Sequence, residues 1–380
     1  MTQKIYLDNN GTTDLAPQVR DLLNSLLMTN LGNPSSTHSF GQKTRSMINR
    51  ARDSISHYLG IKSTELIFNS GGTESANMVL RGRFASNKPG HLITSAAEHS
   101  CVYATAKYLE TTGTSVTFLS PGLWGAVTPE SVRSAIRSET QLIALMAVNN
   151  ETGVKTDIQA IAAIAKENGI PLFVDGVALL GKEAFTIPDG VSAMSFSGHK
   201  IHAPSGVGMC FVRSGFKLSP QITGGEQELG KRAGTENVLG ILALAKAVEL
   251  LVDELPHSSE KMLTLRKQFE EGLLSQLPNA QINGLGPRTV NISNIAFPGV
   301  DGEGLLIALD AAGVAASHGS ACSSGSLEPS RILLNMGIPL ELVRSSIRFS
   351  LSRYTTEEEI VAAIHIVVKT VNRLQDRESR

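Results

Sequence analysis

The sequence predicts an α/β protein with a mainly parallel central sheet, helices on both faces of that sheet, and a smaller α+β domain. Short apolar runs alternate with helical patterns over roughly 200 residues, which is typical of parallel strands joined by crossover helices. Most residues of these runs are apolar, as expected of strands in a sheet that is covered on both faces. At 380 residues, with 41% hydrophobic residues, the chain is long enough for two domains.

The large domain is expected to span residues 15–255. Its first helix, over residues 40–58, has apolar side chains at helical spacing and stops at Gly60. A further helix is expected over residues 158–168. The expected strands, each short and apolar, cover residues 65–69, 91–95, 116–119, 142–148, 171–174, 191–196 and 206–212.

The small domain is expected to combine residues 1–14 with residues 256–380. A long helix that starts after Asn237 is expected to end near Leu255, because Pro256 follows and a proline interrupts a helix. Beyond this boundary, the pattern predicts a strand over 290–297, a helix from residue 302, a loop over 317–329, a strand over 347–351 and a last helix from residue 357.

Charge, apolar runs and cysteine content narrow the class of protein. Lys and Arg number 34 against 35 Asp and Glu, so no basic face for direct binding of nucleic acid is expected. The N-terminus shows no signal-peptide pattern, and the apolar runs are too short to cross a membrane. Three cysteines without a CxxC pair do not form a disulfide framework. A reducing compartment, by default the cytoplasm, is therefore expected.

Polar side chains follow four of the predicted strands: His99, Asn150, Asp175 and Lys200. Ligands of open α/β sheets bind at the C-terminal ends of strands, so these side chains are expected to share a site. Each has an ordinary alternative on its own, such as a helix cap for Asp175, a turn for Asn150 or a surface turn for Lys200.

Together, the four side chains match the needs of pyridoxal 5'-phosphate (PLP). A lysine forms the Schiff base, a carboxylate holds the pyridine nitrogen protonated, and a ring stacks on the cofactor. The glycines before Thr73, at a predicted helix start, offer backbone N–H groups for the phosphate.

Eight motifs, in order, carry a resemblance to a known family. They are LDNNGTT from Leu7, GNPSS from Gly32, NSGGTES from Asn69, NNETG from Asn149, SFSGHK from Ser195, RAGTEN from Arg232, GSACSSGSLEPS from Gly319 and IRFSLSRYTTEEEI from Ile347. From residue 6 to about residue 360, the chain resembles the cysteine desulfurases of the class V aminotransferase superfamily. The resemblance implies the PLP-dependent transferase fold of type I.

The resemblance also implies roles for the residues at the strand ends. Lys200 would form the Schiff base and Asp175 would pair with the pyridinium nitrogen. His99 would stack on the ring and help to move protons, and Asn150 would approach the phenolic oxygen of the cofactor.

Further positions would bind the phosphate and the substrate. Gly72, Thr73, Ser197 and His199 would hold the phosphate, and Thr235 would reach it from a second subunit, which implies a homodimer. Arg348 would hold the carboxylate of L-cysteine in a bidentate contact, assisted by Asn33. Without the motif, Arg348 could equally be a surface residue of an edge strand.

Cys322 distinguishes the implied family from other PLP enzymes. It lies among glycines and serines, which favours an exposed loop, and its thiolate could attack sulfur and carry it away. The form GSACSSGS resembles the long-loop branch of the family. No resident metal is expected, although Cys322 could contact a transferred iron–sulfur cluster. Cys101 and Cys210 are expected to be buried and unreactive.

One cofactor-site position departs from the family pattern. The family has a glutamine three residues after the aspartate, where it donates a hydrogen bond to the phenolic oxygen, and this chain has Ala178. Loss of one hydrogen bond to a charged group costs roughly 1.5–3 kcal/mol. Smaller departures are Glu226 and Ser352, where glycine is usual.

The reaction implied is PLP-dependent removal of sulfur from L-cysteine, giving L-alanine and a persulfide on Cys322. The sulfur would pass to an iron–sulfur scaffold or carrier protein, or to tRNA thiolation. Two alternatives stay open: a selenocysteine lyase or cysteine sulfinate desulfinase, and a low-activity PLP-binding scaffold suggested by Ala178. The sulfur acceptor, the pathway and the organism do not follow from the sequence.

Overall fold

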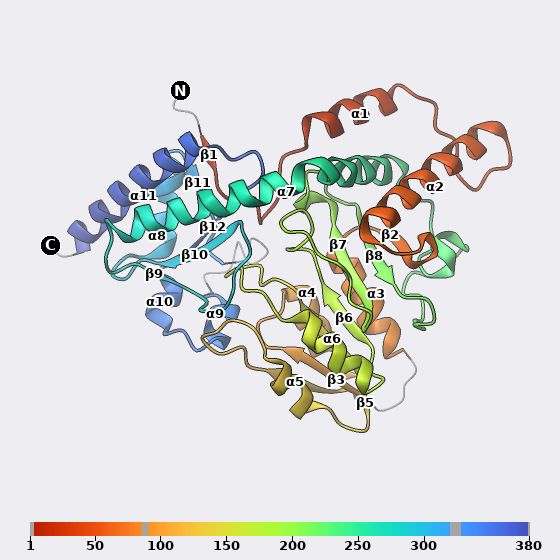
Figure 1. Cartoon of the computed structure of the whole chain (residues 1–380), viewed down its shortest axis with the longest axis horizontal. Coiled ribbons are helices and arrows are strands. Elements are labelled where there is room, and N and C mark those ends of the chain that lie inside the picture. Colours follow the sequence, from red (N-terminus) through yellow and green to blue (C-terminus); the bar gives the residue numbers. More distant parts are fainter. Residues whose placement is uncertain (1–3, 86–89, 320–327, 379–380) are drawn as a thin grey trace.

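The computed structural model describes residues 4–85, 90–319 and 328–378. Two sheets lie at opposite ends of an elongated molecule, and one long helix, α7 (Val238–Leu274), runs past both of them (Figure 1). The larger sheet holds most of the predicted strands. The predicted α/β class, with a mostly parallel central sheet, is confirmed.

The central sheet has seven strands in the order β2-β8-β7-β6-β5-β3-β4. Strand β8 runs against its neighbours β2 and β7, and every other pair is parallel. The C-terminal ends of β5, β6 and β7 therefore lie side by side. The strands are β2 (Leu66–Asn69), β3 (His91–Ser95), β4 (Ser115–Leu119), β5 (Thr140–Met146), β6 (Leu172–Asp175), β7 (Val191–Ser197) and β8 (Gly208–Val212).

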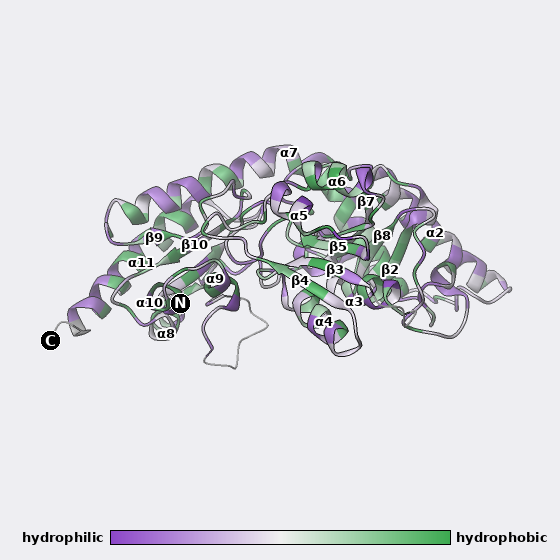
Figure 2. Ribbon diagram, turned by 90° about the horizontal axis from the view of Figure 1, so that it is seen from below, coloured by the Kyte–Doolittle hydropathy of each residue, from purple (hydrophilic) through white to green (hydrophobic). Residues whose placement is uncertain are grey.

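Hydrophobic cores lie on both faces of this sheet, because successive strand residues point to opposite sides. On β5, Leu142 and Ala144 face one core, whereas Ile143 and Leu145 face the other. The strands are mostly hydrophobic, and the helices that cover them carry more hydrophilic residues (Figure 2). Helices α3 (Gly72–Arg83) and α4 (Ser100–Thr111) cover one face, and α2 (Ser39–Leu59), α6 (Ile158–Glu167) and the first half of α7 cover the other.

The smaller sheet is antiparallel, in the order β12-β10-β9. A third core packs it against the second half of α7 and against α8 (Gly302–Ala311) and α11 (Glu357–Glu378). The N-terminal strand β1 (Ile5–Tyr6) joins this end of the molecule by pairing with β11 (Val314–Ala315). The remaining strands are β9 (Gln281–Ile282), β10 (Ile292–Ala296) and β12 (Ser346–Ser350).

The prediction that the long helix ends near Leu255 is wrong. Helix α7 continues through Pro256 to Leu274. Proline removes the helical hydrogen bond to residue 252, and Val252 is 60% exposed, so the interruption falls where the helix faces solvent. Packing on both sides of this point keeps the helix continuous.

We propose that the chain divides as predicted, with residues 15–255 as the large domain and residues 1–14 and 256–380 as the small one. Along α7, Leu255 is the last residue in the core of the large sheet, and Leu265 is the first in the core of the small sheet. The change of core near the predicted boundary supports this proposal.

Several short helices were not predicted, because their apolar patterns are too brief to stand out. They are α1 (Pro17–Leu27), α5 (Pro129–Ala135), α9 (Arg331–Asn335) and α10 (Leu340–Arg344). Among the helices of the described residues, none combines the length and the apolar character needed to cross a membrane.

Candidate active site

A cavity of about 380 Å³ opens at the C-terminal ends of β5, β6 and β7, beside the first turns of α3 and α4. Nine residues predicted to bind the cofactor or the substrate line this one cavity. They are Gly72, Thr73, His99, Asn150, Asp175, Ser197, His199, Lys200 and Arg348. The chain thus gathers side chains from distant segments at the edge of the sheet where ligands of open α/β sheets bind.

Lys200 follows β7 in a short 3-10 turn, η2 (Gly198–Lys200), which directs its side chain into the cavity. Its Nζ donates hydrogen bonds to the backbone carbonyls of Asn10 and Gly11, the latter at 2.7 Å. These carbonyls belong to the LDNNGTT motif, whose polar turn lines the cavity. The sequence shows the motif but does not predict its contact with Lys200.

Asp175 ends β6 and is buried, with 7% of its surface exposed. Its Oδ1 accepts hydrogen bonds from the Val177 backbone N–H at 3.0 Å and from the Ser195 hydroxyl at 3.1 Å. Ser195 lies opposite Asp175 in the pairing of β6 with β7. These contacts hold the carboxylate in one orientation at the cavity wall, as a partner for a pyridinium nitrogen requires.

His99 caps α4, and its Nδ1 accepts a hydrogen bond from the Cys101 backbone N–H at 3.2 Å. Burial lowers the pKa of His99, and the positive charges of Lys200, Arg331 and Arg348 act in the same direction. Asp175 opposes them. At neutral pH the ring is therefore uncharged, with Nδ1 unprotonated, and it can stack on a flat aromatic ligand.

Cys101 differs from its predicted placement, because it lines the cavity instead of lying fully buried. The N-terminus of α4 points at the strand ends, so the side chain two residues after His99 faces the site. Its Sγ lies 3.1 Å from His99 Nδ1. Burial raises the pKa of the Cys101 thiol, which keeps it protonated. Cys210, on β8, is fully buried as predicted, and burial raises its pKa to about 12.

The first turn of α3 forms the end of the cavity suited to a phosphate. Its backbone approaches Val177 so closely that a Cβ atom on Gly72 would lie 2.6 Å from Val177 Cγ2. The preceding Gly71 has φ +146°, a conformation that side chains disfavour. The first N–H groups of a helix have no partner within that helix, and such groups bind anions. Thr73 and Ser197 add hydroxyl groups to the same wall.

His199 lines the cavity beside Lys200, and its Nδ1 lies 3.2 Å from the Thr12 hydroxyl. Burial, with Lys200 as a second cause, lowers the pKa of His199 to about 4. The ring is therefore neutral at physiological pH. It can donate one hydrogen bond to a phosphate without carrying a charge.

Asn150 supports the fit of PLP to this cavity. Its Oδ1 is buried and has no hydrogen-bond partner among the described residues. The two ends of an amide side chain are interchangeable by rotation, so Asn150 can offer either a donor or an acceptor to a ligand. An amine, a fixed carboxylate, a neutral imidazole and a helix N-terminus surround the same space, and this donor set fits PLP.

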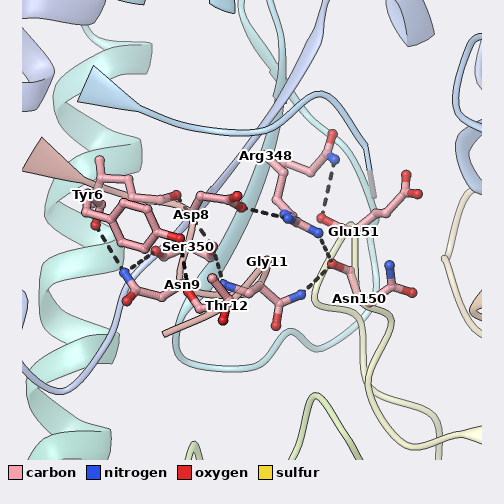
Figure 3. Close-up of polar contacts among 12 residues, drawn as sticks. Tyr6, Asp8, Asn9, Gly11, Thr12, Asn150, Glu151, Arg348 and Ser350 are labelled. Carbon is pink, nitrogen blue, oxygen red and sulfur yellow. Dashed lines mark hydrogen bonds and ion pairs between the residues drawn. The ribbon is translucent and has the colours of Figure 1, made fainter. Parts of the chain in front are cut away.

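Arg348 reaches the cavity from β12 of the smaller sheet. Its Nη2 donates to Asp8 Oδ1 at 2.7 Å, and its Nη1 donates to the Asn150 backbone carbonyl at 3.0 Å (Figure 3). Its Nε is buried and has no hydrogen-bond partner within the described ranges. The guanidinium is thus fixed beside Asn150. A substrate carboxylate bound there could contact the guanidinium together with Asp8.

Three predicted site residues are not placed in the cavity. Asn33 is exposed, and its Oδ1 accepts a hydrogen bond from the Ser35 backbone N–H at 2.8 Å. Thr235 is exposed in the loop before α7. Cys322 lies outside the described residues. The roles of all three residues stay predictions.

Of the three departures from the family pattern, one lies at the site. Ala178 lines the cavity, close after Asp175. Glu226 lines a different, polar surface cavity beside Arg45 and Arg52. Ser352 directly precedes a turn, and its hydroxyl accepts a hydrogen bond from the Tyr354 backbone N–H at 3.2 Å. Only Ala178 is therefore positioned to affect the cofactor directly.

The profile of the aminotransferase class-V family matches residues 5–362. This chain belongs to that family. The family is PLP-dependent, so the cofactor predicted from the sequence is confirmed.

Several curated relatives of this chain are named cysteine desulfurases. The chain is 41% identical to the cysteine desulfurase IscS of Dictyoglomus turgidum over 379 residues, which are 99% of this chain and 96% of that protein. A solved NifS-like protein is similar with a TM-score of 0.91 and 31% identity, covering 98% of this chain and 100% of the other. A structure of SspA in complex with cysteine is similar with a TM-score of 0.82 and 31% identity, covering 93% and 100%.

Proposed function

We propose that this chain is a PLP-dependent cysteine desulfurase that converts L-cysteine to L-alanine and leaves the sulfur as a persulfide on Cys322. The observation that carries the proposal is the single cavity in which Lys200, Asp175 and His99 meet Arg348. The similarity to cysteine desulfurases over nearly the full length supports it, as does the similarity to a protein solved with cysteine.

PLP, when bound, supplies an aldehyde for the lysine amine and an electron sink for the substrate. The chain's own residues do the rest. Arg348 binds the substrate carboxylate and orients it, and the fixed Asp175 carboxylate stabilises a proton on the pyridine ring. The amine of Lys200, which lines the same cavity, would take a proton from the substrate Cα and return it. Neutral His99, whose Nδ1 accepts the Cys101 backbone N–H, carries its proton on Nε2 and could donate it to a bound ligand.

Sulfur transfer is proposed for Cys322, whose thiolate would attack the substrate sulfur. The persulfide would then pass to an acceptor protein, such as an iron–sulfur scaffold or carrier, or toward tRNA thiolation. A homodimer is proposed because Thr235 is exposed and lies away from its own cavity, which suits a contact with the cavity of a second subunit. The cytoplasmic location stays a prediction.

The test is the release of sulfide and alanine from L-cysteine, measured with and without a reductant. The wild type is expected to release both, and Cys322→Ser is expected to bind PLP but to release no sulfide. Borohydride reduction followed by peptide mapping should place the cofactor on Lys200. Turnover of cysteine sulfinate or selenocysteine that survives in Cys322→Ser, without turnover of L-cysteine in the wild type, would instead favour the lyase or desulfinase alternative.

A further inference from the structure

A second lysine, Lys182, lies directly behind Lys200 and is not used in the proposed reaction. Only 2% of its surface is exposed. Its Nζ donates a hydrogen bond to the backbone carbonyl of Lys200 at 3.0 Å. Burial of an amine is costly unless it has a compensating contact, and here the contact is the turn that carries the cofactor lysine.

The surroundings of Lys182 are rich in positive charge. Arg353 is buried and forms an ion pair with Glu254, whose Oε2 lies 3.1 Å from Arg353 Nε. The side chain of Glu254 is 32% exposed, so this pairing lies toward solvent. The neighbouring acid in the sequence, Glu183, is paired with Lys155 at 2.9 Å. No carboxylate is recorded in contact with Lys182 itself in the described structure.

His202 completes the cluster behind η2. Its ring packs edge-on against Tyr354, with centroids 4.8 Å apart, and its Nδ1 donates to the Asp14 carbonyl at 2.8 Å. Burial, together with Lys182 and Arg353, lowers the pKa of His202 to about 3, so it stays neutral. Burial, followed by Arg353 and Lys200, lowers the pKa of Lys182 to about 7. Lys182 is therefore the group in this cluster that changes its charge near neutral pH.

We propose that Lys182 is a positioning residue for Lys200: its amine holds the Lys200 carbonyl in the η2 turn, and its positive charge makes the Lys200 nitrogen release a proton more readily. This inference rests on the proposed role of Lys200 as the cofactor lysine. The hydrogen bond fixes the backbone behind the reacting side chain, whereas Asn10 and Gly11 contact the side chain from the front.

Lys182 Nζ contacts the turn that carries Lys200, and the charge of Lys200 contributes to the lowered pKa of Lys182, so the two titrations are coupled. A proton on Lys182 disfavours a proton on the Lys200 imine, and the reverse holds as well. The imine of the wild type is therefore expected to titrate over a broader pH range than a single group. Removal of Lys182 is expected to give a single-proton curve with a higher midpoint, by up to about one pH unit.

The experiment is a pH titration of the imine absorbance in the PLP-loaded full chain. Lys182→Met removes the charge and the donor, and Lys182→Gln removes the charge but keeps a donor. Both are expected to raise the midpoint and narrow the curve. Lys155→Met is the matched control, since Lys155 is a half-buried lysine that pairs with Glu183 and makes no recorded contact with Lys200. Its curve should superimpose on that of the wild type.

Curves that coincide for the wild type and the Lys182 variants would overturn the inference. If neither variant folds, the test is the titration curve of the wild type. A single-proton curve refutes the coupling, and a broadened curve supports it. The proposed function fails differently, when borohydride fixes the cofactor on a lysine other than Lys200. If borohydride fixes the cofactor on Lys200 but the midpoint of the imine titration is unchanged in the Lys182 variants, only the role of Lys182 is refuted.

Discussion

Replacing Ala178 with glutamine tests whether the missing hydrogen-bond donor limits this enzyme. Ala178 lines the cavity, and the buried Asn150 Oδ1 has no hydrogen-bond partner in the described part of the chain, so the wall near the expected phenolic oxygen is short of polar contacts. A glutamine amide could donate to that oxygen. The cavity of about 380 Å³ leaves space for the longer side chain.

The expected gain follows from two opposing contributions. A hydrogen bond to a charged oxygen contributes roughly 1.5–3 kcal/mol. Fixing a glutamine side chain costs about 1.5–2 kcal/mol in conformational entropy. The difference is at most about 1.5 kcal/mol, which corresponds to a rate increase of up to roughly tenfold. The new donor should also stabilise the phenolate, so the imine proton is released at lower pH, by up to about one unit.

The assay pairs a pH titration of the imine absorbance with the rate of alanine formation from L-cysteine. Ala178→Met is the matched control, because methionine has a similar length and no donor. Equal effects of Gln and Met on both measurements would refute the hydrogen-bond argument. If the wild type shows no turnover of L-cysteine and Ala178→Gln does, the chain is a degenerate desulfurase and the proposed function is wrong.

Three further predictions concern the substrate, the subunits and the dependence on pH. Arg348→Lys should raise the KM for L-cysteine by about 10- to 100-fold, because the variant loses a bidentate contact worth roughly 1.5–3 kcal/mol. Arg344 is exposed, and as a control Arg344→Lys should leave the KM unchanged. Sedimentation should show a homodimer, and a fully active, cofactor-loaded monomer would contradict this prediction. Thr235→Ala should weaken PLP binding. The pKa of His202 is lowered to about 3 from an unfolded value of 6.5, so its contribution to stability is complete above pH 6.5 and is lost as pH falls toward 3. By pH 5 the loss should be roughly 2 kcal/mol, and urea unfolding of His202→Asn should show a smaller fall in stability between pH 7 and pH 5 than the wild type.

The sequence by itself determined the sheet and most of the cavity wall. The strand run 142–148 is apolar throughout and the run 191–196 is mostly apolar, so their burial and their class could be inferred from local pattern alone. Side chains such as Asp175 and Lys200 follow those strands directly. The C-terminal ends of parallel strands meet at one edge, so position along the chain already implied proximity in space.

Tertiary structure decided the contacts between segments that no local pattern connects. Arg348 meets Asp8 across 340 positions because β12 and the N-terminal segment are brought together in the smaller part of the molecule. Helix α7 continues through Pro256 because packing on both sides outweighs one lost hydrogen bond. The buried amine of Lys182 reaches the Lys200 carbonyl only once β6 and β7 pair. Periodicity reports which face of an element is buried, but not which distant group lies against that face.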